Sequence, residues 1–257
     1  MGIVNLTPDS FSGDGLVGNI DHAIERARQQ FEAGSDILDV GAESSRPGAI
    51  PTPESVEIER LIPVLKVITT WGVPVSVDTY KPSVMRAALD AGATMINDIG
   101  GMVDPEAIAA VAATDCAVCL MHMQGKPGTM QHAPYYADVL AEVRAFLGQA
   151  VERCRQAGME ESRLVLDPGF GFGKTLSHNL TLFRALTAAI SDELPLLVGI
   201  SRKSMLGEIT HRPVEQRQAA SIAAALIAAQ KGARILRVHD VAATRDALAV
   251  WQAIEQG

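Results

Sequence analysis

Short apolar runs recur along the chain, and four of them end in a polar residue able to take part in chemistry. Each run follows a helix-ending glycine and has the composition of a buried parallel strand. The runs lead from Gly34 to Asp39, from Gly72 to Asp78, from Gly92 to Asn97 and from Gly232 to Arg237. Parallel strands gather their carboxyl ends on one rim, so we expect the chemistry at that rim.

Apolar runs of this kind alternate with segments of helical spacing. We expect strands near residues 2–6, 36–40, 73–78, 94–97, 116–121, 164–167, 195–200 and 233–238. An apolar stripe from Ile20 to Phe31 predicts the first helix, and prolines at the first helical position open the next three at Pro53, Pro82 and Pro105. Further helices are expected over residues 137–157, 177–190, 214–231 and 241–255.

Repeated strand–helix units without a break in composition predict an α/β fold, a single-domain TIM (β/α)8 barrel over residues 1–257. The alternative is a doubly wound sheet. That fold favours a glycine-rich fingerprint after the first strand, where this chain has Asn5-Leu6-Thr7-Pro8-Asp9. The first expected strand starts at residue 2, so we expect a few native residues to precede this sequence.

Charge and hydropathy exclude several classes of function. The formal net charge is −8, whereas nucleic-acid binding needs a basic patch, so we expect no nucleic-acid partner. No apolar run reaches the roughly 20 residues of a membrane span, and Asp9 and Asp14 interrupt any signal-peptide core. We therefore expect no membrane partner.

The cysteines predict a reducing compartment rather than a metal site. Cys116 and Cys119 have C-x-x-C spacing but lie in an expected strand, where residues three apart point to opposite faces. Together with Cys154 they are expected to be free thiols, which indicates the cytoplasm. No two histidines have the spacing of zinc ligands.

Residues 167–175 (DPGFGFGKT) have only a superficial likeness to a phosphate-binding loop. That loop needs four residues between its first glycine and the Gly-Lys-Thr, and Gly169 and Gly173 enclose three. We interpret the segment as a strand-end loop that points Asp167 into a pocket. Its glycines would let the backbone approach a flat molecule.

Asp78, Asn97 and Asp167 follow three different expected strands and should converge. A carboxylate accepts two parallel hydrogen bonds from an N–C–N edge, and an amide both donates and accepts. The set therefore suits a planar heterocycle such as a pterin or a purine. Simple capping of the next helices is the alternative, and it explains three such residues on one rim less well.

A second set of residues is cationic. Lys203 follows the seventh expected strand, and Arg237 and His239 end the eighth, where they should share one face. The loops after these strands form the usual phosphate-binding corner of the fold. Arg46, Arg202 and Asn5 could join them across the rim, whereas solvation at the surface is the alternative. His122, after the fifth strand, is expected to line the site.

The helix expected over residues 214–231 is apolar nearly all round between residues 219 and 229. Such a helix is buried on two sides. One side should face the barrel, and the other either a neighbouring helix or a second subunit.

Eight motifs at expected strand ends resemble, in order, those of the dihydropteroate synthase family, the folate-pathway enzymes targeted by sulfonamides. They are residues 5–12 (NLTPDSFS), 43–48 (ESSRPG), 76–79 (SVDT), 96–98 (IND), 121–125 (MHMQG), 167–174 (DPGFGFGK), 201–204 (SRKS) and 237–240 (RVHD). The resemblance covers the whole chain.

The resemblance implies that p-aminobenzoate displaces pyrophosphate from 6-hydroxymethyl-7,8-dihydropterin pyrophosphate to give dihydropteroate. Residues implied to bind the pterin are Asp78, Asn97, Met121, Asp167 and Lys203. Those implied to bind pyrophosphate are Asn5, Arg46, Arg237 and His239, with Asn5 placing Mg²⁺. Those implied to bound the aminobenzoate slot are Phe11, Ser45, Arg46, Pro47, Phe172 and Ser201. The catalytic set implied is Asn5, Asp78, Asp167, Lys203, Arg237 and His239. We also expect a homodimer.

The sequence departs from the family at two points, and two rival functions stay open. Ser45 stands where the family usually has Thr, and the glycine pattern of residues 13–15 is altered. One rival is a pterin-dependent methyltransferase, which would not need the anion-binding set of Arg46, Arg237 and His239. The other is a paralogue that binds pterin without turnover.

Overall fold

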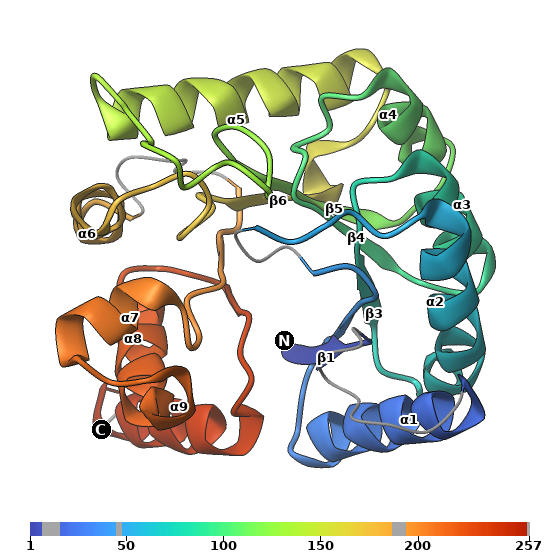
Figure 1. Cartoon of the computed structure of the whole chain (residues 1–257), viewed down its shortest axis with the longest axis horizontal. Coiled ribbons are helices and arrows are strands. Elements are labelled where there is room, and N and C mark those ends of the chain that lie inside the picture. The colour runs from blue at the N-terminus through green and yellow to red at the C-terminus, as the bar shows by residue number, and fades with distance from the viewer. Residues whose placement is uncertain (7–15, 45–47, 187–193, 256–257) are drawn as a thin grey trace.

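Parallel strands run through the centre of the molecule, and they follow one another in chain order (Figure 1). The computed structural model describes residues 1–6, 16–44, 48–186 and 194–255. Within them the strands are β1 (Gly2–Asn5), β2 (Leu38–Gly41), β3 (Val75–Asp78), β4 (Met95–Asp98), β5 (Ala117–Met121), β6 (Leu164–Asp167), β7 (Leu197–Val198) and β8 (Ile235–Leu236).

Backbone pairing joins these strands into a ring. β1 to β6 form one parallel sheet in sequence order, and β7 pairs with β8. An isolated parallel bridge between Leu166 and Leu196 joins β6 to the start of β7, and another between Gly2 and Val238 joins β8 to β1. The amide of Ile3 donates to the carbonyl of Val238 at 3.0 Å across this second junction. The ring is the (β/α)8 barrel that the sequence predicts.

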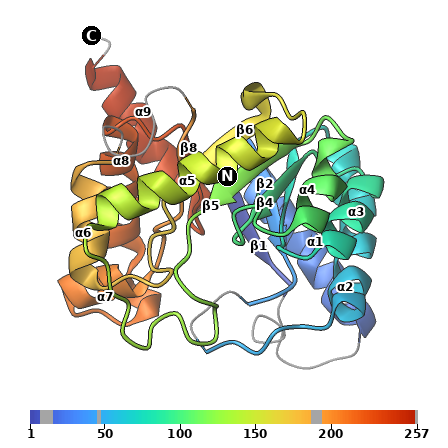
Figure 2. The ribbon, with the colours of Figure 1, turned by 90° about the horizontal axis from the view of Figure 1, so that it is seen from above.

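Helices form the outer layer, with α1–α4 on one side and α6–α9 on the other (Figure 2). They are α1 (Leu16–Glu32), α2 (Glu54–Ile68), α3 (Pro82–Asp90), α4 (Pro105–Ala112), α5 (Val139–Gln156), α6 (Leu176–Arg184), α7 (Ser204–Thr210), α8 (Gln218–Gln230) and α9 (Val241–Glu255). Short 3-10 turns cover η2 (Thr69–Trp71), η3 (Glu161–Arg163) and η4 (Val214–Gln216). No helix of the described residues is long and apolar enough to cross a membrane.

Proline chemistry explains several helix starts. Pro82 and Pro105 occupy the first turn of α3 and α4, as predicted, because a first-turn residue needs no intrahelical donor. Asp104 caps α4 by accepting the amide of Glu106 at 2.9 Å. Pro53 differs from the prediction, since it is the residue before α2 rather than its first. The seven-residue helix α7 was not predicted, because one short turn with an internal glycine carries little periodic signal.

The interior of the barrel is apolar at its amino end and polar at its carboxyl end. Met1, Met95, Cys119, Val165 and Leu197 form one buried cluster, against which Ile235 packs. Side chains two residues apart on a strand point to the same face. The next inward positions on four of these strands are therefore Asn97, Met121, Asp167 and Arg237. The strand geometry therefore places these four residues at the carboxyl rim of the barrel.

The three cysteines are buried free thiols, as the sequence predicts. Cys119 packs inside the barrel, whereas Cys116 packs in the core between strands and helices. The opposite orientation of residues three apart on a strand thus separates the two sulfurs. Their C-x-x-C spacing has no metal-binding meaning.

Candidate active site

Arg237 joins two carboxylates at the centre of the carboxyl rim. Its Nε donates to Asp39 Oδ2 at 2.6 Å, and its Nη2 donates to Asp78 Oδ2 at 2.8 Å. Burial disfavours the guanidinium charge, but the two carboxylates outweigh it and raise the pKa of Arg237 further. The side chain is therefore a fixed cation that bridges β2, β3 and β8.

Asp39 lies elsewhere than the sequence suggests. We expected it where the second strand ends, but β2 continues to Gly41, so Asp39 is a mid-strand residue that points into the barrel. It is fully buried, and its Oδ1 has no hydrogen-bond partner among the described residues. Sequence analysis left Asp39 out of the candidate site. The sequence pattern that could have indicated Asp39 is its two-residue spacing from Gly41, which places both residues on the inward face of the strand.

Asp78 is a rim carboxylate whose protonation is perturbed by burial. Burial raises its pKa to about 7, Arg237 opposes the shift, and the neighbouring charge of Asp39 adds to it. Near neutral pH this carboxyl exchanges between an acceptor and a donor form. That property suits a group that contacts a heterocycle with both kinds of polar edge.

Asp167 and Lys203 form the opposite side of the rim. Burial raises the pKa of Asp167, and the charge of Lys203 opposes that shift. Asp167 Oδ1 accepts the amide of Gly169 at 2.7 Å. Burial lowers the pKa of Lys203 to about 8, and its Nζ lies 4.7 Å from the ring centroid of Phe172. A carboxylate, an ammonium and an aromatic face are thus close together.

Asn97 and Met121 complete the floor between these two sides. Asn97 is buried, and its Oδ1 accepts no hydrogen bond from the described residues. Its neighbour Asp98 faces away and holds a turn, accepting the amides of Gly100 and Met102. Met121 packs in one buried cluster with Phe172. Asn97 therefore offers a polar contact, and Met121 an apolar surface, to a flat molecule.

Ser201 and His239 meet where the last two loops of the barrel approach. Ser201 Oγ lies 3.0 Å from His239 Nδ1 and accepts the amide of His239 at 3.3 Å. β8 ends at Leu236, so His239 lies in the turn beyond it rather than on the strand with Arg237. Arg202, which we had considered as part of the cationic set, forms a two-pronged ion pair with Asp240.

The remaining predicted residues are Asn5 and four residues that the structure does not describe. Asn5 is half-buried at the end of β1, beside Gly41 of β2. Phe11, Ser45, Arg46 and Pro47 lie outside the described residues. Their assignments stay predictions.

Glu43, from one of the family motifs, has a structural role. It accepts the Lys81 ammonium and the Thr52 amide, the latter at 2.7 Å. Glu57 contacts the same ammonium at 2.8 Å. Burial would lower the pKa of Lys81, but the two carboxylates outweigh it and raise that pKa. This buried ion cluster fastens the start and the end of the segment between β2 and α2.

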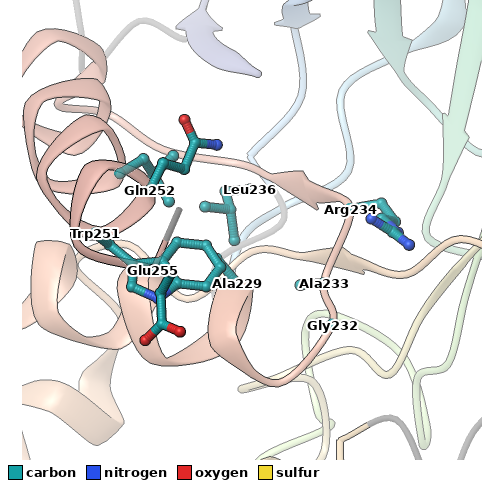
Figure 3. A pocket seen from close by; sticks show the side chains of 9 residues that line it. Ala229, Gly232, Ala233, Arg234, Leu236, Trp251, Gln252 and Glu255 are labelled. Atoms are coloured by element: carbon teal, nitrogen blue, oxygen red, sulfur yellow. The ribbon is translucent and has the colours of Figure 1, made fainter. Parts of the chain in front are cut away.

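A cavity of about 380 Å³ lies at the opposite end of the barrel, between α8, β8 and α9 (Figure 3). Ala229, Gly232, Ala233, Leu236 and Trp251 line much of it, with Arg234 and Glu255 among its polar residues. Active sites in this fold sit at the carboxyl ends of the strands. The rim of Asp78, Asn97 and Asp167, rather than this cavity, is therefore the candidate active site.

The chain is similar to proteins of a known family. Residues 1–239 match the family described as pterin binding enzyme. The dihydropteroate synthase of Escherichia coli (strain K12) is 48% identical over 254 residues, which cover 98% of this chain and 90% of that protein.

Solved structures are equally similar. Yersinia pestis dihydropteroate synthase with a sulfonamide drug complex superposes with a TM-score of 0.94 at 46% identity, covering 100% of this chain and 94% of that chain. Burkholderia cenocepacia dihydropteroate synthase complexed with 7,8-dihydropteroate gives a TM-score of 0.91 at 47% identity, covering 99% and 90%. The chain therefore belongs to the dihydropteroate synthase family of pterin-binding enzymes.

Proposed function

We propose that this protein condenses 6-hydroxymethyl-7,8-dihydropterin pyrophosphate with p-aminobenzoate to give 7,8-dihydropteroate and pyrophosphate. The observation that carries the proposal is the convergence of Asp78, Asn97 and Asp167 with Lys203 and Arg237 at one rim. Their hydrogen-bonding groups match the mixed donor and acceptor edges of a pterin. The resemblance of the rim motifs to those of the family supports the same conclusion.

The pterin would lie on the floor of this rim. Asp167 and Asp78 would accept hydrogen bonds from ring and amino N–H groups, while Lys203 would donate to a ring acceptor. Met121 and Phe172 would contact its faces. Positive charge develops on the pterin as its exocyclic C–O bond breaks, and the buried carboxylates stabilise that charge electrostatically.

Pyrophosphate would leave toward the cationic side of the rim. Asp39 and Asp78 use two of the five N–H groups of Arg237, so other donors of the same guanidinium can reach phosphate oxygens. His239, Arg46 and Asn5 are the further candidates. Their donors would neutralise the charge that grows on the departing oxygens.

Aminobenzoate would enter from the side opposite the leaving group. Phe172 and Ser201 are proposed to line its slot. Four further residues proposed for the slot lie outside the described residues: Phe11, Ser45, Arg46 and Pro47. An aryl amine is nucleophilic when neutral, so the attack needs no strong base. The proposed reaction therefore does not require an arrangement of the Ser-His-Asp type.

Mg²⁺ is proposed as the metal. No group of three or more His, Cys, Asp or Glu side chains that could hold a metal occurs among the described residues. Mg²⁺ keeps several waters and often binds through few protein oxygens plus substrate phosphates, so a single amide oxygen near the pyrophosphate site suits it. The amide oxygen of Asn5 is the proposed protein contact. The ion would supply further neutralisation of charge on the leaving group.

We also propose a homodimer. Ile209 on α7, Val214 on η4 and Ile227 on α8 are exposed in the single chain. Ala219, Ala223 and Ile227 follow one another at four-residue intervals on α8, opposite its buried face. Exposed apolar side chains on neighbouring elements favour an interaction surface. Sedimentation equilibrium should give twice the chain mass, and Ile227→Asp should shift it toward the single chain.

The test of the proposed reaction is a product assay. The protein is incubated with the pterin pyrophosphate and p-aminobenzoate, with and without Mg²⁺, and dihydropteroate and pyrophosphate are quantified. We expect both products in equal amounts only with the metal. Pterin binding without turnover would favour the non-catalytic paralogue. Lack of Mg²⁺-dependent pyrophosphate affinity would favour the methyltransferase.

A further inference from the structure

Lys174, the lysine of the glycine-rich segment, is buried beneath the rim and has an acceptor for each of its three N–H groups. Its Nζ lies 2.8 Å from His122 Nδ1, 2.9 Å from the Gly169 carbonyl and 3.1 Å from the Phe172 carbonyl. Only 3% of the residue is exposed. An ammonium placed this way acts as an internal cation around which the loop of residues 168–173 is folded.

The same loop lies directly against the segment that follows β5. A Cβ on Gly169 would be 1.8 Å from the His122 carbonyl oxygen, and one on Gly173 would be 2.4 Å from that of Gln124. Both glycines have positive φ angles, 69° and 63°. Only glycine allows this approach and this backbone conformation. The glycines bring the two loops into contact, and Lys174 holds them there.

This arrangement connects Lys174 to the pterin-binding side of the rim. Gly169 accepts the Lys174 ammonium at its carbonyl oxygen and donates its amide to Asp167 Oδ1. Lys174 also donates to the carbonyl oxygen of Phe172. The ring of Phe172 lies against the Lys203 ammonium. Displacing the Lys174 ammonium would therefore disturb both the orientation of the Asp167 carboxylate and the position of the Phe172 ring.

Burial and neighbouring charges act on both Lys174 and His122. Burial lowers the pKa of Lys174 to about 7, while Asp167 opposes the shift and Lys203 adds to it. Burial, helped by the charge of Lys174, lowers the pKa of His122 to about 3, so its ring is neutral and accepts through Nδ1. The charged groups that face Asp167 are Lys203, Lys174 and Arg237, and each lowers its pKa.

We propose that Lys174 is a positioning residue of the pterin site, which fixes the loop of residues 168–173 and, through it, Asp167 and Phe172. The inference rests on the proposed function, because that function places the pterin on Asp167. Lys174 itself does not touch the reacting atoms. Its contribution should appear as pterin affinity and as the pH dependence of that affinity.

The test compares Lys174→Met with the parent protein by calorimetric titration with 6-hydroxymethylpterin between pH 5 and 8. We expect at least a tenfold loss of affinity. Removal of the ammonium also raises the pKa of Asp167, so the fall in affinity on acidification should begin at a higher pH. Lys126→Met, at an exposed lysine of the neighbouring loop, should change neither quantity. Leu147→Ala, on the buried face of α5, controls for lost stability alone.

An unchanged affinity and an unchanged pH profile in folded Lys174→Met would overturn the inference. If that variant does not fold, ¹⁵N spectra of histidine-labelled parent protein test the contact directly, with His122→Gln to assign the signal. We expect an unprotonated Nδ1 and no titration of His122 between pH 5 and 8. A His122 ring that titrates near pH 6.5 would contradict the Lys174 contact. Neither readout needs turnover, so failure of the proposed reaction is recognised separately, by absence of product from the parent protein.

Discussion

The two ends of the barrel interior differ in polarity, although they are only two residues apart along the same strands. Met95, Val165 and Ile235 belong to the apolar end, and the residues two positions later are Asn97, Asp167 and Arg237 at the polar rim. The two-residue period of a strand therefore separates a layer that stabilises the fold from the layer that we propose carries the chemistry. The comparison shows that one strand serves both purposes without conflict.

The two layers also differ in what their burial costs. Apolar burial stabilises the amino end outright. At the rim, burial of Asp39, Asp78 and Asp167 is unfavourable, and Arg237 and Lys203 offset it. The buried rim carboxylates therefore lower the stability of the fold unless their cationic partners are present. Substitutions at the two ends should therefore fail in different ways.

The largest effect is expected at the centre of the rim. Arg237→Ala leaves the Asp39 and Asp78 carboxylates buried without their cation, which should lower the free energy of unfolding by about 3–5 kcal/mol. Turnover should fall below detection, measured in the product assay with the folded fraction known. Arg245→Ala removes an exposed Arg–Asp pair at 3.3 Å and should cost under about 1 kcal/mol with full activity. Equal stability losses in the two variants would contradict this account of the rim.

The next effect is expected at the apolar end. Leu197→Ala opens a cavity in the cluster of Met95, Cys119 and Val165, and it should lower the free energy of unfolding by about 2–5 kcal/mol in urea titration. Its kcat and KM should match those of the parent at temperatures where it stays folded. A change in KM for the pterin substrate would mean that the two layers are not separate.

A smaller, specific effect is expected for Asp167→Asn. One carboxylate oxygen becomes an amide donor that faces pterin donors, so pterin affinity should weaken by about 1–3 kcal/mol in calorimetric titration. Asp90→Asn, at an exposed position on α3, is the matched control and should bind normally. Parent-like affinity of Asp167→Asn would remove Asp167 from the pterin site.

The stability of the protein should also depend on pH through Asp78. The pKa of Asp78 is raised in the folded state from its ordinary value of 3.8 to about 7, so the folded protein binds the extra proton more tightly. Its contribution is complete below about pH 3.8 and is lost as the pH rises to about 7. Denaturant titrations from pH 4 to 7.5 should show a shallower decline for Asp78→Asn than for the parent. A steeper decline would reverse the sign that we assign.

Particular residues show how far the sequence predicts this molecule. Asp78, Asn97, Asp167 and Arg237 were predicted at strand ends because an apolar run leads directly to each. Asp39 follows the same kind of run, yet it lies mid-strand. A two-residue run cannot reveal that β2 extends to Gly41, since that end depends on pairing with β1.

The contacts of Lys174 were beyond reach for a different reason. Its three acceptors come from two loops. The acceptor outside its own loop, His122, is 52 residues away along the chain. Spacing alone ruled out a phosphate-binding loop and could go no further. Long-range loop packing is fixed by tertiary contact rather than by a local pattern, so only the structure could reveal it.

A crystal structure with bound 6-hydroxymethylpterin tests the central claim most directly, because the claim is that the chemistry belongs to the carboxyl rim. We predict that the pterin ring lies within hydrogen-bond distance of Asp78, Asn97 and Asp167, with the exocyclic carbon facing Arg237. A pterin bound instead in the cavity between α8, β8 and α9 would contradict the account.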